Sequence, residues 1–131
     1  MREYEYKTGS VYTGEWLGGM RHGQGKMVWA DNGCYEGKWL YNQACGQGKF
    51  THSTGDVYDG AWVNNKANGF GTYTTLNGAR YEGEWRDDHQ HGKGVEILQG
   101  GAKYEGQYTM GNKDGFGKYT YINGATYEGE W

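Results

Sequence analysis

A period of 23 residues runs through the chain and constrains its fold more than any other feature. Tyrosine recurs at this spacing without insertion or deletion, at Tyr12, Tyr35, Tyr58, Tyr81, Tyr104 and Tyr127. A glycine stands two residues after each tyrosine, and an aromatic residue stands four after it, at Trp16, Trp39, Trp62, Trp85, Tyr108 and Trp131. A Gly-x-Gly pair then completes the unit, as at Gly23 and Gly25. A fixed period of this length predicts repeats that pack only on their neighbours.

Alternation within each unit predicts β-strands separated by turns. In Tyr-x-Gly-x-Trp the aromatic residues and the glycine fall on one face, and residues such as Glu82 and Glu84 fall on the other. Two columns contain only residues that accept positive φ at little cost. They are Gly19, Asn42, Asn65, Asp88 and Gly111, and Gly9, Asn32, Gly55, Gly78, Gly101 and Gly124. With a turn at each end of its strands, every unit is predicted to be a β-hairpin.

The return strand of each hairpin alternates as well. One side carries Met27/Trp29, Phe50/His52, Tyr73/Thr75 and Tyr119/Tyr121. The fourth unit departs from this pattern, with Val95/Ile97 and Glu96/Leu98 in the corresponding places. A glycine in the middle of a strand weakens it unless another group lies close by. We therefore expect a large side chain from a neighbouring strand to lie across each glycine of the first strand.

The chain is predicted to form a single repeat array over residues 1–131. A half repeat covers 1–11, five repeats begin at residues 12, 35, 58, 81 and 104, and a truncated repeat covers 127–131. The expected twelve or so antiparallel strands, roughly 4.8 Å apart, give a ribbon on the order of 55 Å long. Because the pattern stops one strand into a repeat, we expect the chain to be a fragment of a longer array.

The repeat unit is similar to that of one known family. The stretch from Tyr81 to Gly94, with its Tyr-Glu-Gly-Glu-Trp start and later His-Gly-x-Gly, closely resembles the membrane occupation and recognition nexus (MORN) repeat. Departures from the pattern are local. The histidine before Gly-x-Gly is kept at His22 and His91 and is replaced by Cys45, Asn68 and Asp114. Tyr108 stands where the other repeats have tryptophan.

The resemblance implies an elongated, twisted β-ribbon. It also implies scaffolding, partner docking or attachment to phosphoinositide membranes, in settings that include cytoskeletal complexes and ciliary radial spokes. Together with the hairpin pattern it defines the predicted fold class. This class is all-β, an elongated twisted single-layer antiparallel ribbon of consecutive β-hairpins with a 23-residue repeat.

No catalytic, cofactor or metal site is predicted. The serines, Ser10 and Ser53, lie beside turn glycines and have no base in a plausible arrangement. The Gly-x-Gly pairs lack a following helix, so we interpret them as structural turns rather than phosphate-binding loops. His22 and His91 lie in one column, roughly 29 Å apart, and cannot share an ion. His89-x-His91 lacks further ligands of matching type, which favours surface-turn histidines over adventitious metal binding.

The two cysteines are expected to be free thiols. Cys34 and Cys45 are placed at opposite ends of one strand, roughly 20 Å apart, which is too far for a disulfide.

Two sets of aromatic residues have different expected roles. The first set repeats in every unit and is expected to form the core, by stacking over the glycines: Tyr12, Trp16, Tyr35, Trp39, Tyr58, Trp62, Tyr81, Trp85, Tyr104 and Tyr108. The second set varies between repeats and is predicted to contact a partner: Trp29, Phe50, Tyr73, Tyr119 and Tyr121. A single-layer sheet leaves this face uncovered, so it could hold a partner helix or an extended peptide.

Charge argues against other classes of partner. The 13 Lys and Arg residues fall in many columns, so no basic stripe forms for nucleic acid, and direct phosphoinositide binding is weakened for the same reason. Acidic residues recur on the polar face, at Glu15, Glu36, Asp59, Glu82, Glu84, Glu105, Glu128 and Glu130. We expect this face to stay in water; the alternative is an acidic strip that attracts a basic segment, which lysines interrupt.

The sequence therefore favours a non-enzymatic repeat scaffold that binds another protein through its aromatic face, within a cytoskeletal or ciliary assembly. A membrane-tethering module and a self-associating spacer remain as alternatives, the latter through the terminal edge strands near Tyr4 and Tyr127. No apolar run approaches the roughly 18 residues needed to span a bilayer, and the first residues lack a secretory signal. A cytoplasmic location is expected.

Overall fold

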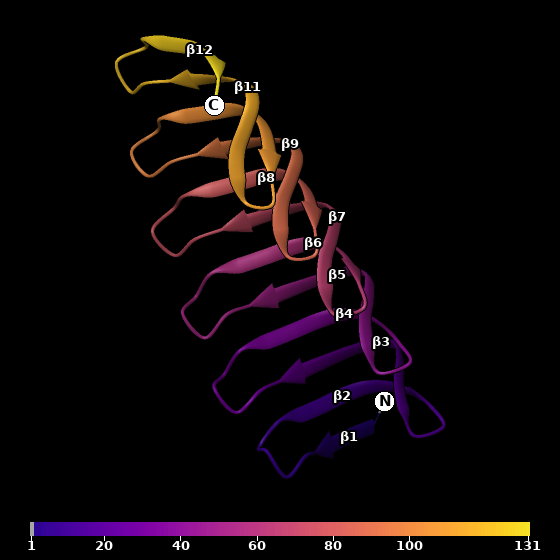
Figure 1. Ribbon diagram of the computed structural model, residues 1–131. Coiled ribbons are helices and arrows are strands. Elements are labelled where there is room, and N and C mark those ends of the chain that lie inside the picture. Colours follow the sequence, from indigo (N-terminus) through magenta and orange to yellow (C-terminus); the bar gives the residue numbers. More distant parts are fainter. Residues whose placement is uncertain (1) are drawn as a thin grey trace.

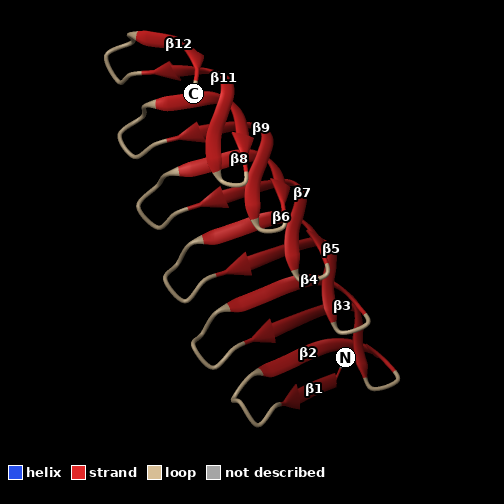
Figure 2. Cartoon of the chain, viewed as in Figure 1, coloured by secondary structure: helices blue, strands red, loops and turns tan. Residues whose placement is uncertain are grey.

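The computed structural model describes residues 2–131, which fold into one sheet of twelve strands (Figures 1 and 2). The strands are β1 (Arg2–Glu5), β2 (Val11–Leu17), β3 (Met20–Val28), β4 (Cys34–Leu40), β5 (Gln43–Thr51), β6 (Val57–Val63), β7 (Lys66–Thr74), β8 (Arg80–Arg86), β9 (His89–Ile97), β10 (Lys103–Thr109), β11 (Asn112–Thr120) and β12 (Thr126–Glu130). Each strand pairs antiparallel with its neighbours in chain order. The predicted all-β ribbon of consecutive hairpins is confirmed.

The hairpins stack along one axis, from the indigo N-terminal end to the yellow C-terminal end (Figure 1). Each hairpin bends near its middle, so its shorter turn stands at an angle to its longer one. No described residues form a helix able to cross a membrane. The bend gives the sheet the form of a trough, and the tyrosine and tryptophan columns lie on its inner face.

The Gly-x-Gly pair places two glycines directly opposite each other in every hairpin. Gly14 pairs with Gly25 and Gly37 with Gly48, and the later repeats follow the same register. The tyrosine ring of the same hairpin lies over this pair, so a Cβ atom on Gly25 would overlap the Tyr12 ring. The glycines are therefore required by close packing.

The expectation that a side chain from a neighbouring strand covers the glycine of the first strand is wrong. The ring beside Gly14 comes from Tyr12 on the same strand rather than from a neighbouring strand, and it reaches across to Gly25 on the next strand. Its hydroxyl then donates a hydrogen bond to the carbonyl oxygen of Glu15, at 2.7 Å. The equivalent bonds in the other repeats are Tyr35 to Lys38, Tyr58 to Ala61, Tyr81 to Glu84 and Tyr104 to Gln107.

A bulge follows the glycine pair and explains the first glycine of Gly-x-Gly. The register shifts so that residues 22–24 of β3 face Glu15 alone on β2. Gly23 takes a φ of 88°, which a larger residue would adopt only with strain. The Glu15 carboxylate accepts a hydrogen bond from the freed backbone N–H of Gln24, at 3.0 Å. Because bulges bend the strand that carries them, their repetition accounts for the bend of every hairpin.

Both predicted turn columns are turns in the structure. The longer turns carry Asn32, with a φ of 72°, or a glycine with positive φ in the corresponding place. The shorter turns contain two residues, and both have positive φ in four of them: Tyr41/Asn42, Asn64/Asn65, Asp87/Asp88 and Met110/Gly111. This pattern is that of type I′ turns, whose twist matches that of the paired strands.

Replacing Gly48 with alanine tests whether the ring requires the glycine pair. The new methyl group would overlap the Tyr35 ring, so we expect the free energy of unfolding in urea to fall by about 2 to 3 kcal/mol. Gly19→Ala is the matched control, because its methyl group would enter open space and its φ is not positive. Equal stability of the two variants would contradict the role given to the ring.

Candidate functional site

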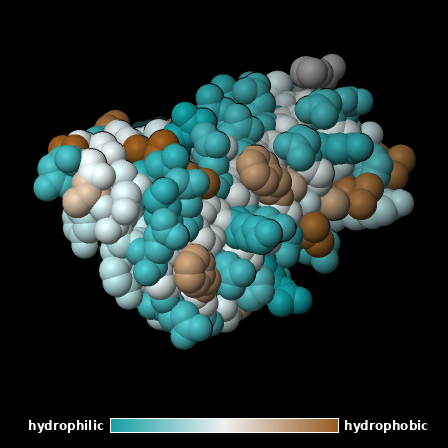
Figure 3. Space-filling model, turned by 90° about the horizontal axis from the view of Figure 1, so that it is seen from above, coloured by the Kyte–Doolittle hydropathy of each residue, from teal (hydrophilic) through white to brown (hydrophobic). Residues whose placement is uncertain are grey.

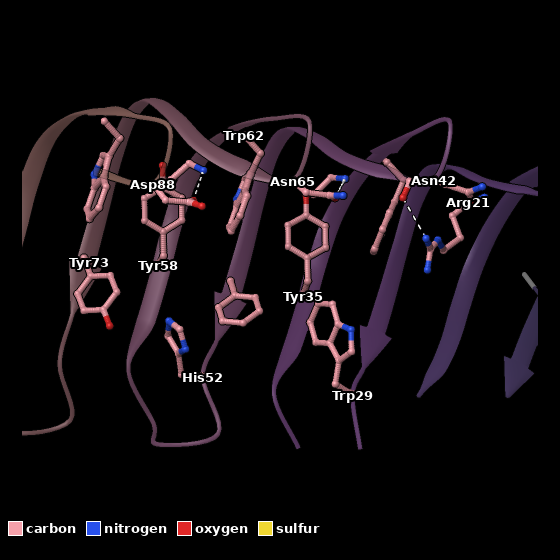
Figure 4. A pocket seen from close by; sticks show the side chains of 15 residues that line it. Arg21, Trp29, Tyr35, Asn42, His52, Tyr58, Trp62, Asn65, Tyr73 and Asp88 are labelled. Carbon is pink, nitrogen blue, oxygen red and sulfur yellow. Dashed lines mark hydrogen bonds between the residues drawn. The ribbon is translucent and has the colours of Figure 1, made fainter. Parts of the chain in front are cut away.

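A groove lined by aromatic side chains runs along the inner face of the sheet from β3 to the turn after β8. Its volume is about 570 Å³. We call it the aromatic groove and define it by its lining residues: Arg21, Trp29, Tyr35, Trp39, Asn42, Ala44, Phe50, His52, Tyr58, Trp62, Asn65, Ala67, Tyr73, Trp85 and Asp88. Trp62 enters from the side of the shorter turns, and Trp29 and His52 enter from the opposite side, toward which the Tyr73 hydroxyl points (Figure 4).

The floor of the groove is a ladder of tyrosine and tryptophan rings packed edge to face. Tyr35 contacts Trp39 of its own repeat and Trp62 of the next, with ring centroids 5.1 and 5.3 Å apart. The same double contact recurs at Tyr12, Tyr58, Tyr81 and Tyr104. Of the ten residues expected to form the repeat core, eight are buried, and Trp16 and Trp85 are partly buried. Edge-to-face pairs each contribute about 0.5 to 1.5 kcal/mol beyond area burial.

Indole hydrogen bonds join successive repeats beneath the groove. Trp39 Nε1 donates to the Gly25 carbonyl at 3.1 Å, Trp62 Nε1 to Gly48 at 2.9 Å and Trp85 Nε1 to Gly71 at 3.2 Å. Each bond runs from one repeat to the second glycine of the repeat before it. The tryptophan column therefore positions each repeat relative to its neighbour.

The junction between the fourth repeat, which carries Glu96, and the fifth, which carries Tyr108, departs from this arrangement. Tyr108 replaces the tryptophan, and its hydroxyl donates to the Glu96 carboxylate at 3.0 Å. The same carboxylate lies 3.3 Å from the Lys113 ammonium. Glu96 occupies the column of Phe50 and Tyr73, so a charged network takes the place of an apolar ring just beyond the end of the groove.

The residues predicted to contact a partner divide into two groups. Trp29, Phe50 and Tyr73 all line the groove and are partly exposed. Trp29 and Phe50 have ring centroids 5.5 Å apart. Tyr119 and Tyr121 lie outside the groove, toward the C-terminal end, where their rings are 4.7 Å apart. The structure thus brings three of the five together and separates the other two.

The rim on the side of the shorter turns was missed by the sequence reasoning, which treated its residues only as turn formers. Asn65 Oδ1 accepts the backbone N–H of Ala44 at 2.7 Å, and Asp88 Oδ1 accepts that of Ala67 at 2.7 Å. Asn42 Oδ1 likewise accepts the N–H of Arg21 at 2.8 Å. Each of these side chains ties its own repeat to the preceding one. The sequence feature that could have predicted this contact is the presence of Asn or Asp, which carry a side-chain acceptor, in a turn column that also admits glycine.

The histidine column has a similar structural role. His22 Nδ1 accepts the backbone N–H of Tyr41 at 3.3 Å, and His91 Nδ1 accepts that of Met110 at 3.4 Å. Among residues 2–131, no three His, Cys, Asp or Glu side chains are grouped to hold a metal ion.

The cysteines lie on two strands rather than on one. Cys34 begins β4 and Cys45 belongs to β5, so the expected placement on one strand is wrong. Both are free thiols, and burial raises the pKa of Cys34.

The outer face of the sheet carries balanced charge. Lys26 and Lys49 pair across the strands with Glu36, and Lys49 pairs again with Asp59. Hydrophilic side chains are interspersed with hydrophobic ones over the surface seen in Figure 3. Lysines thus stand directly opposite Glu36 and Asp59. This pairing argues against an acidic strip that attracts a basic segment.

Comparison with known families identifies the chain. The MORN repeat family model matches residues 12–34, 35–57, 58–80, 81–103 and 104–126, so the chain belongs to the MORN repeat family. No curated protein matches the sequence significantly.

Two solved structures are similar to the chain at low sequence identity. One is the TCP domain of Drosophila melanogaster SAS-4 (dCPAP) in complex with a proline-rich motif of Ana2 (dSTIL). It is 11% identical over 96% of this chain and 69% of that chain, with a TM-score of 0.61. The other is the TCP10c domain of Drosophila melanogaster Sas-4, 13% identical over 96% of this chain and 89% of that chain, with a TM-score of 0.42. The first likeness is one of fold.

The buried tyrosines make stability sensitive to high pH. Burial raises the pKa of Tyr81 to about 12, with smaller effects from Glu84 and Glu96, and burial also raises the pKa values of Tyr35 and Tyr58. Because the folded state favours the neutral phenol, this stability is fully present below pH 10, where the unfolded phenol titrates, and is lost as pH rises.

We therefore expect the free energy of unfolding in urea to fall between pH 10 and pH 12, with tyrosinate absorbance appearing as the protein unfolds. Tyr81→Phe should lose part of this dependence. A constant free energy of unfolding across that range would contradict the burial of the phenols.

Replacing Asn65 with glycine tests the clamp between repeats. Glycine accepts the positive φ but removes the acceptor for the Ala44 N–H, so we expect the free energy of unfolding to fall by about 1 kcal/mol. Asn65→Asp is the matched control, because Asp88 fills this role in the next repeat. If the aspartate variant loses as much stability as the glycine variant, the acceptor is not what the position contributes.

Proposed function

We propose that the chain is a non-enzymatic scaffold that binds an extended segment of a partner protein in the aromatic groove. The observation that carries this proposal is the cluster of Trp29, Phe50 and Tyr73, partly exposed rings in a concave groove of about 570 Å³. Tyrosine and tryptophan are favoured anchors at protein interfaces because they bury large area at low entropic cost. Their columns vary between repeats, so the fold does not require rings there.

The size of the groove supports an extended segment over a helix. The groove crosses the sheet from β3 to β8, five strand spacings or about 24 Å. A helix of that length and about 10 to 12 Å in diameter occupies on the order of 2,000 to 3,000 Å³, several times the volume of the groove. A row of side chains from an extended peptide fits the space better.

Two further considerations support the proposal. Aromatic-lined grooves bind polyproline II segments, which arrive already extended and lose little entropy on binding. The SAS-4 TCP domain, similar in fold, is seen with a proline-rich motif of another protein. We therefore propose a proline-containing, apolar segment as the ligand. The family resemblance implies roles in cytoskeletal and ciliary assemblies, and on that basis we propose that the chain works in an assembly of this kind.

The double variant Phe50→Ser with Tyr73→Ser tests the groove. Wild-type and variant chains would be used to capture partners from a lysate of the source cells, with quantitative mass spectrometry as the readout. We expect one or more proteins to be captured by the wild type and lost with the variant, because both rings that line the groove are removed.

The matched control is Phe70→Ser, which removes an exposed ring from β7 outside the groove and should leave capture unchanged. Circular dichroism of all three proteins checks that the β-sheet is kept. Equal capture by the wild type and the folded double variant would refute the groove as the binding site.

A further inference from the structure

The aromatic groove carries opposite charges at its two ends. Arg21 lies on β3 at one end, and Asp88 lies in the turn after β8 at the other. Between them, on the same rim, stand the neutral side chains of Asn42 and Asn65 (Figure 4). The rim therefore changes from positive through neutral to negative along the axis of the array.

Arg21 is held in place without a charged partner. Its guanidinium lies 4.8 Å from the ring centroid of Trp39 and 5.6 Å from that of Tyr6, and Nη2 donates to the Asn42 carbonyl at 3.0 Å. The Nε atom is buried with no hydrogen bond. Within residues 2–131, no ion pair includes Arg21. A fixed and unneutralised guanidinium is suited to binding a carboxylate.

Neither charge is needed by the fold. Asn42 and Asn65 make the same hydrogen bond with a neutral acceptor in the preceding repeats, so the clamp forms without the negative charge of Asp88. The column of Arg21 contains Ala44 and Ala67 in the next two repeats. Asp88 is also absent from the ion pairs of the described part of the chain.

The remaining carboxylates near the groove are already engaged. Asp56, on the opposite rim, accepts hydrogen bonds from the Tyr73 hydroxyl at 2.9 Å and the Leu76 N–H at 3.0 Å. Glu96, beyond the end of the groove, accepts from Tyr108 and pairs with Lys113. Asp88 differs from Asp56 in that only its Oδ1 accepts a hydrogen bond, from the Ala67 N–H. Among the described residues Arg21 and Asp88 are therefore the charged groups of the groove that we assign to contact with a ligand.

We propose that the groove selects an extended peptide by its charge pattern: an apolar centre with an acidic group that meets Arg21 and a basic group that meets Asp88. This inference rests on the proposed function. The two side chains are five strand spacings apart, about 24 Å. An extended or polyproline II segment advances about 3.1 to 3.3 Å per residue, so the acidic and basic residues of the ligand stand seven or eight positions apart.

The chain itself provides neutralising substitutions for the test. Arg21→Gln copies Gln90, which occupies the same column in the fourth repeat, and Asp88→Asn copies Asn65. A displayed library of random twelve-residue peptides is selected on three proteins: the wild type, the R21Q/D88N double variant and the groove variant Phe50→Ser with Tyr73→Ser. Sequencing then gives the residue frequencies and the spacing of charges among the enriched peptides.

We expect peptides enriched on the wild type to share an apolar centre and an acidic and a basic residue seven or eight positions apart. On R21Q/D88N the apolar centre should persist and the charge pair should be lost. One enriched peptide, titrated by the tryptophan fluorescence of the groove, should bind about three- to tenfold more weakly to each single variant. Raised salt should reduce that difference.

The alternative outcomes separate the two proposals. Peptides without a spaced charge pair, or the same pair on R21Q/D88N, would overturn the charge pattern while leaving the groove as a binding site. If nothing is enriched on the wild type beyond what the Phe50→Ser with Tyr73→Ser variant retains, the groove does not bind extended peptides, and both proposals fail.

Discussion

The close contact between a tyrosine ring and a pair of facing glycines is the interaction on which this structure depends. The ring reaches the backbone of the neighbouring strand only because Gly25 and its equivalents have no side chain. Once there, the hydroxyl bonds to the backbone three residues on, and the ring edge meets tryptophans of two repeats. A sheet with few aliphatic residues thus builds its core from rings laid on its own backbone, without a second layer.

The bend of each hairpin follows from the same motif. The first glycine of Gly-x-Gly forms the bulge, and the second lies under the tyrosine ring. The same three residues therefore bend the strand and provide the surface on which the ring packs. Repetition of the bend turns a flat ribbon into a trough, and the trough brings side chains from both ends of each hairpin into one groove. The concave binding surface is therefore a consequence of the way in which the core is made.

The sequence was sufficient to predict the strand order, the turn columns and the ring core, because each is encoded by contacts that recur every 23 residues. The bend was not predictable, since alternation of period two specifies a strand but not the bulge within it. This is also why Tyr119 and Tyr121 could not be separated from Trp29 and Phe50: their columns match, and only the trough shows which lie in the groove. The role of the rim in joining repeats was not predicted, because the positive φ of a turn is by itself a sufficient reason for Asn42 and Asn65.

Variation among repeats separates what the fold requires from what remains open to function. Columns that pack on the backbone hardly vary, whereas the column of Arg21 holds Arg, Ala, Ala, Gln and Lys in successive repeats. Ala44 and Ala67 occupy this column in the next two repeats and are buried there. The fold therefore does not require a positive charge at this position. The same reasoning applies to Asp88, whose neighbours perform its structural task without charge. In a nearest-neighbour array each such difference stays local, so specificity can be set repeat by repeat along the groove without altering the ladder of rings beneath it.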